Sequence, residues 1–245
     1  MLATEELWQL AIAPFVGSFA GTAAVRLAAG QSFVFGRSAC RNCGYRLRPR
    51  DLVPLVSWTA LRGRCRACGA PISLLYPVSE IAALSVALAA AASVPEDAPG
   101  WATCLLGWWL LTLALTDVLA FLLPDCLTLP LAGAGLVEAA LCQSAALPDR
   151  LVGLVVGYSA FALLAVVYLR LRGREGLGRG DWKLMAAIGA WVSWQALPVV
   201  VMVASVAALG GALVGLFGRP IALAARVPFG AFLCLAAWAV WLGLV

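Results

Sequence analysis

Long, uninterrupted apolar runs constrain this chain more than any other feature. They lie at residues 7–29, 74–94, 101–121, 127–147, 151–169, 184–197, 199–217 and 228–245. Because about 20 apolar residues span the hydrocarbon core of a bilayer as a helix, and 63% of the residues are hydrophobic, water cannot be the solvent for most of the chain. We expect an all-α polytopic membrane protein with about eight transmembrane helices. The two runs beside Pro198 form either a tight hairpin or one broken helix.

The first apolar run is predicted to be a retained helix. It follows Glu5 and Glu6 instead of a basic head, and no clear small-residue cleavage site precedes Arg26. Both features argue against a signal peptide.

The basic residues predict the topology. If the N-terminus lies outside, sixteen of the seventeen fall in loops on the cytoplasmic side, with only Arg150 opposite, where the acidic Glu96 and Asp97 also lie. The sixteen are Arg26, Arg37, Arg41, Arg46, Arg48, Arg50, Arg62, Arg64, Arg66, Arg170, Arg172, Arg174, Arg179, Lys183, Arg219 and Arg226. This bias predicts that both termini are periplasmic. It explains the net charge of +5 better than a nucleic-acid partner does.

A loop at residues 30–73 is the only sizeable extramembrane segment, and it contains two CxxC motifs. Cys40 and Cys43 form the first and Cys65 and Cys68 the second, each followed by glycine. The spacing is typical of a zinc ribbon, in which four thiolates hold one tetrahedral ion and leave no position for water. Two disulfides are the alternative, but the basic loop is expected in a reducing compartment. We therefore predict structural zinc.

The chain divides into a first transmembrane helix at 1–29, the cytoplasmic tetracysteine loop at 30–73 and a membrane-embedded core at 74–245. Four further cysteines are interpreted as small buried residues of the core. They are Cys104, Cys126, Cys142 and Cys234.

The chain contains no histidine, which excludes Ser/His/Asp and Cys/His catalysis and His-ligated zinc hydrolysis. Carboxylates are the remaining candidates for acid–base chemistry. Asp117 lies near the inner end of the third run, and Asp181 opens the sixth in the sequence GLGRGDWKL. A carboxylate near hydrocarbon indicates a functional site, and two that meet can activate water and protonate a leaving group. An aspartate that only caps a helix is the plainer interpretation of Asp181.

Other carboxylates have weaker interpretations. Asp125 follows Pro124 and is interpreted as a helix cap, and Asp51 as a surface residue of the loop. Glu80, inside the second run, is a candidate either for an ion pair with an arginine or for binding substrate or cofactor. Glu138 has no partner that the sequence identifies.

Taken in order, these residues resemble the type IV prepilin peptidases, the bifunctional leader peptidase/N-methyltransferases. The resemblance is carried by GSF at 17–19, the paired CxxC motifs, DLVPLVSW at 51–58, YPVSE at 76–80, Asp117 before LPD, GLGRGDWKL and PFG at 228–230. It implies that Asp117 and Asp181 are the catalytic aspartates.

The resemblance also implies an activity. Such enzymes cleave prepilin or pseudopilin leaders after a glycine at the cytoplasmic face of the bacterial inner membrane, in type IV pilus or type II secretion systems. Many then methylate the new N-terminus with S-adenosylmethionine. Two departures from the family pattern are Gly21, where asparagine is usual in GSFxN, and Arg41-Asn42, which replace the common proline of the first CxxC.

Two readings from other classes remain open. A transporter or proton-conducting protein would use paired acids as a relay. A non-catalytic assembly factor would use the zinc ribbon to dock a partner. Replacing each aspartate by asparagine distinguishes these from a peptidase.

Overall fold

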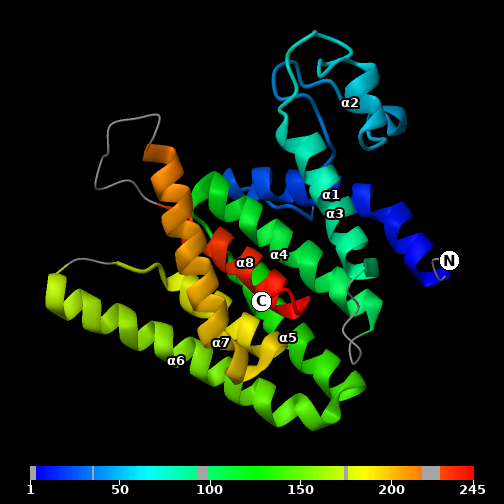
Figure 1. Cartoon of the computed structure of the whole chain (residues 1–245). Helices are drawn as coiled ribbons and strands as arrows, with labels where there is room; N and C mark the ends of the chain where they lie inside the picture. Colours follow the sequence, from blue (N-terminus) through cyan, green and yellow to red (C-terminus); the bar gives the residue numbers. More distant parts are fainter. Residues whose placement is uncertain (1–3, 35, 93–98, 174–175, 217–226) are drawn as a thin grey trace.

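A computed structural model describes residues 4–34, 36–92, 99–173, 176–216 and 227–245 (Figure 1). Five charged residues that entered the topology prediction lie outside these ranges. They are Glu96, Asp97, Arg174, Arg219 and Arg226.

The described residues form helices and contain no strand, as expected for an all-α membrane protein. The long helices are α1 (Thr4–Ala28), α3 (Leu75–Ala92), α4 (Gly100–Ala120), α5 (Asp125–Cys142), α6 (Leu147–Arg172), α7 (Arg179–Leu216) and α8 (Phe229–Trp241). Short elements are η1 (Pro49–Asp51), α2 (Val56–Ala60) and η2 (Ser144–Ala146). By length and composition, six of the long helices can cross a membrane, and α8 is a shorter apolar helix.

Helix α7 consists of two helical halves that meet at Ser193, whose φ of 67° and ψ of 169° are not helical. Trp191, before this residue, packs on Trp241 near the end of α8 at a ring-centroid distance of 5.5 Å. After it, a Cβ placed on Gly211 would lie 3.1 Å from Phe232, in the first turn of α8. The second half therefore returns along α8, and the halves form a hairpin (Figure 1).

This geometry corrects the expected helix count. The runs at 184–197 and 199–217 belong to one element, so the described residues hold seven long helices in place of eight. The break lies at Ser193 and not at Pro198. Pro198 is accommodated close to the beginning of the second half, where little helix precedes it.

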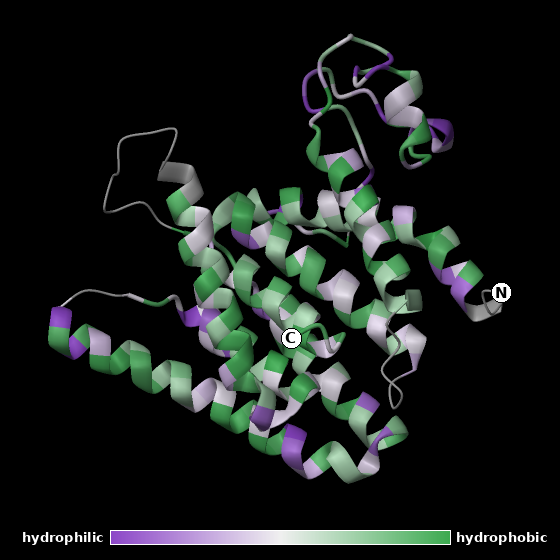
Figure 2. Ribbon diagram, in the orientation of Figure 1, coloured by the Kyte–Doolittle hydropathy of each residue, from purple (hydrophilic) through white to green (hydrophobic). Residues whose placement is uncertain are grey.

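Helices α4 and α8 lie at the centre of the bundle (Figure 1). Helix α4 packs against α1, α3 and α8, whereas α7 packs against α5, α6 and α8. A shared core joins these layers and includes Leu106, Leu110, Leu113, Leu131, Trp191 and Leu233. The outward faces of the helices remain apolar (Figure 2), as expected for surfaces in contact with lipid.

Small residues allow α6 and α7 to approach closely. A Cβ on Gly153 would lie 2.4 Å from the carbonyl oxygen of Gly189, and one on Gly157 would lie 2.4 Å from that of Met185. Glycine at these positions brings the two backbones into contact, as in other packed membrane helices.

The segment between α1 and α3 lies outside the bundle, beyond the beginning of α3 (Figure 1). It carries η1, α2 and two isolated antiparallel bridges, Ala39 with Arg46 and Arg64 with Pro71. Its hydrophilic residues contrast with the apolar helices (Figure 2).

Candidate active site and metal centre

The two CxxC motifs fold into nearly identical turns. The N–H of Cys40 donates to the carbonyl of Tyr45 at 2.9 Å, and the N–H of Cys65 donates to the carbonyl of Ala70 at 2.8 Å. The glycine after each second cysteine, Gly44 or Gly69, has φ 70°. Only glycine adopts this conformation without strain, which is why it follows each motif.

The four thiols gather at one point. The sulfur atoms of Cys40, Cys43, Cys65 and Cys68 all lie within 4.8 Å of one another, and those of Cys40 and Cys68 are 3.8 Å apart. The edge of a tetrahedron with Zn–S bonds of about 2.3 Å is also about 3.8 Å. All four cysteines are free thiols. The cluster can therefore hold a metal ion, and its donor set and geometry fit zinc.

Backbone and side-chain donors favour a thiolate at this centre. Hydrogen bonds lower the pKa of Cys68 to about 6, chiefly from the backbone of Ala70 and next from the Asn42 side chain. Asn42 Nδ2 lies 3.7 Å from the Cys68 sulfur. Asn42, one of the departures from the family pattern, thus supports the centre.

Asp51 joins the two arms of the loop. Its carboxylate pairs with Arg66 Nε at 2.7 Å and accepts the backbone N–H of Arg48 at 3.1 Å. The Arg66 guanidinium is the main cause of a lowered Asp51 pKa. Its partners cover the Asp51 side chain, of which 2% is exposed, although the residue as a whole is half-buried in the loop.

Asp117 lies in the last turn of α4 and is 4% exposed. Its Oδ2 accepts the backbone N–H of Ala231 at 2.8 Å, in the first turn of α8. A Cβ on Gly230 would lie 2.9 Å from this oxygen and 2.8 Å from Leu123 Cδ1. The absence of a side chain at Gly230 therefore lets α8 approach the carboxylate.

Asp181 lies in the first turn of α7. Its Oδ2 accepts the N–H of Gly178 at 3.1 Å, while its own N–H donates to the Gly178 carbonyl at 3.1 Å. This reciprocal pattern stabilises a helix start. Asp181 is therefore the third residue of α7 and not its N-cap, because the helix begins at Arg179 and the Asp181 side chain reaches back to Gly178. The second carboxylate oxygen is left for other partners.

Asp117 and Asp181 belong to one site. Leu123 lies between them: a Cβ on Gly180 would be 2.9 Å from Leu123 Cβ, and the same leucine borders Gly230. The loop after α4 and the starts of α7 and α8 thus bring two carboxylates together.

An ion pair fixes the start of α7. Lys183 Nζ lies 2.6 and 2.7 Å from the two carboxylate oxygens of Asp125, in the first turn of α5. The prediction that Asp125 caps its helix is wrong, because the N-cap is Pro124 and no side chain caps it. Asp125 instead anchors the turn that carries Asp181.

Glu80 is 5% exposed, and its Oε2 accepts the backbone N–H of Leu55 at 2.7 Å. Of the two alternatives for Glu80, the ion pair with an arginine is not formed by any described residue. Helix α1 packs beside it: a Cβ on Gly21 would lie 2.5 Å from Ser79 Oγ. Glycine in place of the family's asparagine therefore accompanies close packing of α1 on α3.

Glu138 has a partner that the sequence analysis missed. It forms an ion pair with Arg150, and both side chains are at most 3% exposed. Arg150 also donates to Gln143 and lies 5.5 Å from the ring centroid of Trp241. The signal was present, since the predicted topology places Arg150 alone among the basic residues on the periplasmic side.

Two of the four remaining cysteines are placed as expected. Cys104 and Cys234 are buried, whereas Cys126 and Cys142 are exposed, which corrects their prediction as buried residues. Both exposed cysteines lie at ends of α5, where packing is incomplete.

The fold and these sites define a polytopic helical membrane protein with a four-thiol centre and a paired carboxylate site. Residues 12–94 match the bacterial peptidase A24 N-terminal domain, and residues 104–215 match the type IV leader peptidase family. The chain belongs to this family of prepilin leader peptidases/N-methyltransferases.

Individual relatives cover most of the chain. A prepilin leader peptidase/N-methyltransferase of Aeromonas hydrophila is 41% identical over 208 residues, which is 82% of this chain and 70% of the relative. One of Pseudomonas aeruginosa is 37% identical over 210 residues, 84% of this chain and 71% of the relative. One of Burkholderia pseudomallei is 41% identical over 197 residues, which is 80% of this chain and 64% of the relative. No solved structure matches the chain.

Proposed function

We propose that this chain is a membrane aspartyl endopeptidase that cleaves the leader of type IV prepilins or pseudopilins after a glycine. Asp117 and Asp181 are its catalytic residues. The observation that carries the proposal is the convergence of these two carboxylates, from helices far apart in sequence, on Leu123 and the first turn of α8.

In this mechanism one carboxylate is the general base and the other the general acid of peptide hydrolysis. One removes a proton from water, whose oxygen adds to the carbonyl carbon of the glycine. The other donates a proton to the leaving nitrogen as the C–N bond breaks. The N–H of Ala231 fixes the Asp117 carboxylate, so little reorganisation is needed during the reaction.

We also propose that the new N-terminal amine is methylated. S-adenosylmethionine supplies the methyl group when bound. The segment 30–73 and its neighbouring helices form the methyltransferase part, and zinc held by Cys40, Cys43, Cys65 and Cys68 has a structural role because four thiolates complete its coordination.

The expected setting is the bacterial inner membrane, with both termini periplasmic and the carboxylates at the cytoplasmic face. The hairpin of α7 supports this topology, because the reversal at Ser193 returns the end of α7 toward the side on which the helix begins. The basic side chains of the 30–73 segment then lie on the cytoplasmic side. The substrate's apolar segment lies in the bilayer, and no nucleic-acid partner is invoked.

The test is cleavage of a prepilin peptide by the purified protein in detergent, with S-adenosylmethionine present and products weighed by mass spectrometry. Asp117→Asn and Asp181→Asn should each abolish cleavage. Asparagine at 181 keeps an oxygen that can accept the Gly178 N–H, so the start of α7 is preserved. Asp149→Asn, which changes an exposed carboxylate near the beginning of α6, serves as the control.

A methyl-sized mass increase on the wild-type product would support the second activity. Undiminished cleavage by either aspartate variant would contradict the dyad. Absence of cleavage by every form, including wild type, would favour the transporter or assembly-factor readings.

A further inference from the structure

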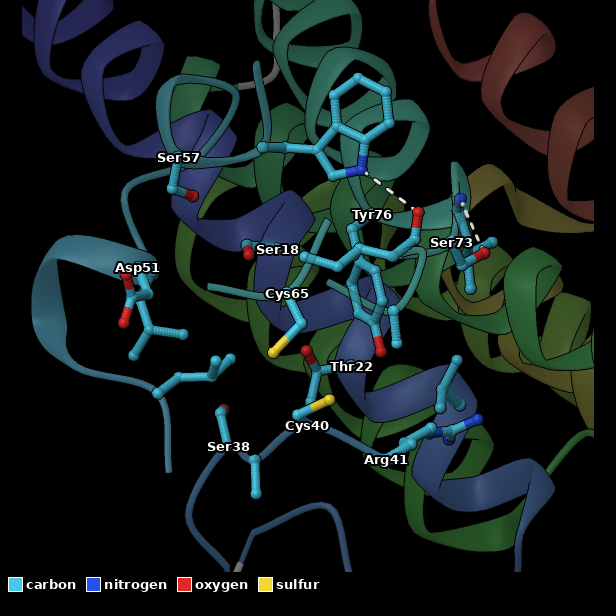
Figure 3. Close-up of a pocket in the computed structure, with 18 of the residues that line it drawn as sticks. Ser18, Thr22, Ser38, Cys40, Arg41, Asp51, Ser57, Cys65, Ser73 and Tyr76 are labelled. Atoms are coloured by element: carbon cyan, nitrogen blue, oxygen red, sulfur yellow. Dashed lines mark hydrogen bonds between the residues drawn. The ribbon is translucent and has the colours of Figure 1, made fainter. Parts of the chain in front are cut away.

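A pocket of about 710 Å³ lies between α1, the beginning of α3 and the tetracysteine segment (Figure 3). Ser18 and Thr22 of α1 face Tyr76 of α3 across it, and Cys40 and Cys65 of the thiol centre form one wall. Its volume is in the range of small-molecule sites, about 300 to 1,000 Å³. The folded cysteine segment is thus part of a binding cavity.

Glu80 lines this pocket, and its carboxylate has no basic side chain as an ion-pair partner among the described residues. Its carboxylate is almost fully buried, and among the described residues no lysine or arginine lies within 4.0 Å of it. Four arginines line the pocket. Arg66 pairs with Asp51, Arg26 donates to the carbonyls of two loop residues, and neither Arg37 nor Arg41 forms an ion pair with Glu80. A buried carboxylate without a counter-ion is costly, and a cationic ligand would supply the missing charge.

The turn beside Glu80 is strained. Leu55 has φ 60° and ψ −48°, and the N–H of Val56 donates to the carbonyl of Pro54 at 2.6 Å, which makes a γ-turn with positive φ. Such turns are rare and are retained where the surroundings enforce them, often at ligand sites. Here the enforcing group is Glu80, which accepts the Leu55 N–H at 2.7 Å.

We propose that this pocket binds S-adenosylmethionine and that Glu80 faces its sulfonium. The inference rests on the proposed methyltransferase function and assigns its donor site. The pocket is far larger than a peptide amine needs, and the rings of Tyr76 and Trp58 on its wall suit the adenine.

The pocket also adjoins the proposed peptidase site. Leu119, which lines it, lies two residues after Asp117 in α4. Successive positions in a helix turn by about 100°, so the two residues occupy different faces of the same helix end. A newly released N-terminus therefore reaches the donor by passing around the end of α4.

The test is ligand binding, measured by calorimetry on the purified, zinc-loaded protein in nanodiscs. Sinefungin carries an ammonium in place of the sulfonium, whereas S-adenosylhomocysteine has a neutral sulfur and is otherwise similar. Glu80→Gln keeps an oxygen for the Leu55 N–H while removing the charge. We expect it to weaken sinefungin at least tenfold and S-adenosylhomocysteine less than threefold.

Two further variants test whether the ligands bind in this pocket. Thr22→Trp fills the pocket and should abolish binding of both ligands. Asp149→Asn removes a carboxylate near the beginning of α6 and should change neither affinity. Zinc content and melting temperature of each variant verify folding.

Equal losses for both ligands in Glu80→Gln would overturn the sulfonium assignment, since Glu80 would then contact a part that they share. Unchanged affinities in Glu80→Gln, or retained binding in Thr22→Trp, would overturn it as well. If wild type binds sinefungin in a Glu80-dependent manner but does not methylate a cleaved pilin peptide, the donor site stands and the proposed methyl transfer fails.

Discussion

The Asp117 carboxylate is held by the backbone of a residue 114 positions away, Ala231, whose N–H donates to it at 2.8 Å. Ala231 lies in the first turn of α8, where free N–H groups and the helix dipole favour a carboxylate. The PFG sequence begins this turn, with Pro228 as the N-cap, and its glycine has a structural reason because Gly230 permits the approach.

Adding one methyl group at this contact should disable the proposed peptidase. In Gly230→Ala the new Cβ would lie 2.9 Å from Asp117 Oδ2 and 2.8 Å from Leu123 Cδ1, so the carboxylate must move. Since a misplacement of about 1 Å can cost on the order of 100-fold in rate, we expect kcat for leader cleavage to fall about 100-fold. Gly133→Ala in α5, where no atom lies within 4 Å of the new Cβ, is the matched control. Equal activity of the two variants would contradict this account.

Loss of the metal should unfold the tetracysteine segment and spare the bundle. Cys43→Ser removes one thiolate, and we expect bound zinc, measured by elemental mass spectrometry, to be lost, because metal binding drives folding of such small units. Tryptic cleavage between Arg37 and Arg66 should accelerate about tenfold or more as local opening increases. Helical circular dichroism should change little. Cys142→Ser, at an exposed cysteine of α5, should retain zinc.

Breaking the buried Arg150–Glu138 pair should destabilise the bundle strongly. Arg150→Met leaves the Glu138 carboxylate buried and unpaired, which costs about 3 to 5 kcal/mol. The double variant Arg150→Met/Glu138→Leu should recover most of that loss in reversible unfolding experiments. Lys183→Met, at an ion pair whose side chains are 34% and 57% exposed, should cost less than about 1 kcal/mol. A double variant as unstable as the single one would refute the explanation.

The reversal within α7 should be relieved by glycine. Ser193 has φ 67° and ψ 169°, a region that costs a residue with a side chain about 1 to 3 kcal/mol. Ser193→Gly should therefore raise the free energy of unfolding by about 1 kcal/mol. Ser159→Gly, inside α6, should lower it by about 0.5 kcal/mol because glycine is a poor helix former. The measurement is the melting temperature of both variants and of wild type in one detergent. A Ser193→Gly melting temperature below that of wild type would exclude strain at this turn.

Local patterns in the sequence predicted much of this protein correctly. Apolar runs predict helices because a bilayer leaves the backbone no other way to satisfy its hydrogen bonds. The two CxxCG motifs predict a common centre because thiolate spacing and positive-φ glycines are local properties. The break in α7 was misplaced because a proline is visible in sequence, whereas the strained backbone at Ser193 is not.

Tertiary structure decided what depends on partners distant in the chain. The sequence by itself determined the helices, the four thiols and the carboxylates near the membrane boundary. Only packing brought Asp117 to Ala231, paired Glu138 with Arg150, and left Glu80 facing a cavity without a counter-ion. The physical reason is that a charge in an apolar surrounding depends on the few groups that reach it, and those groups come from other helices.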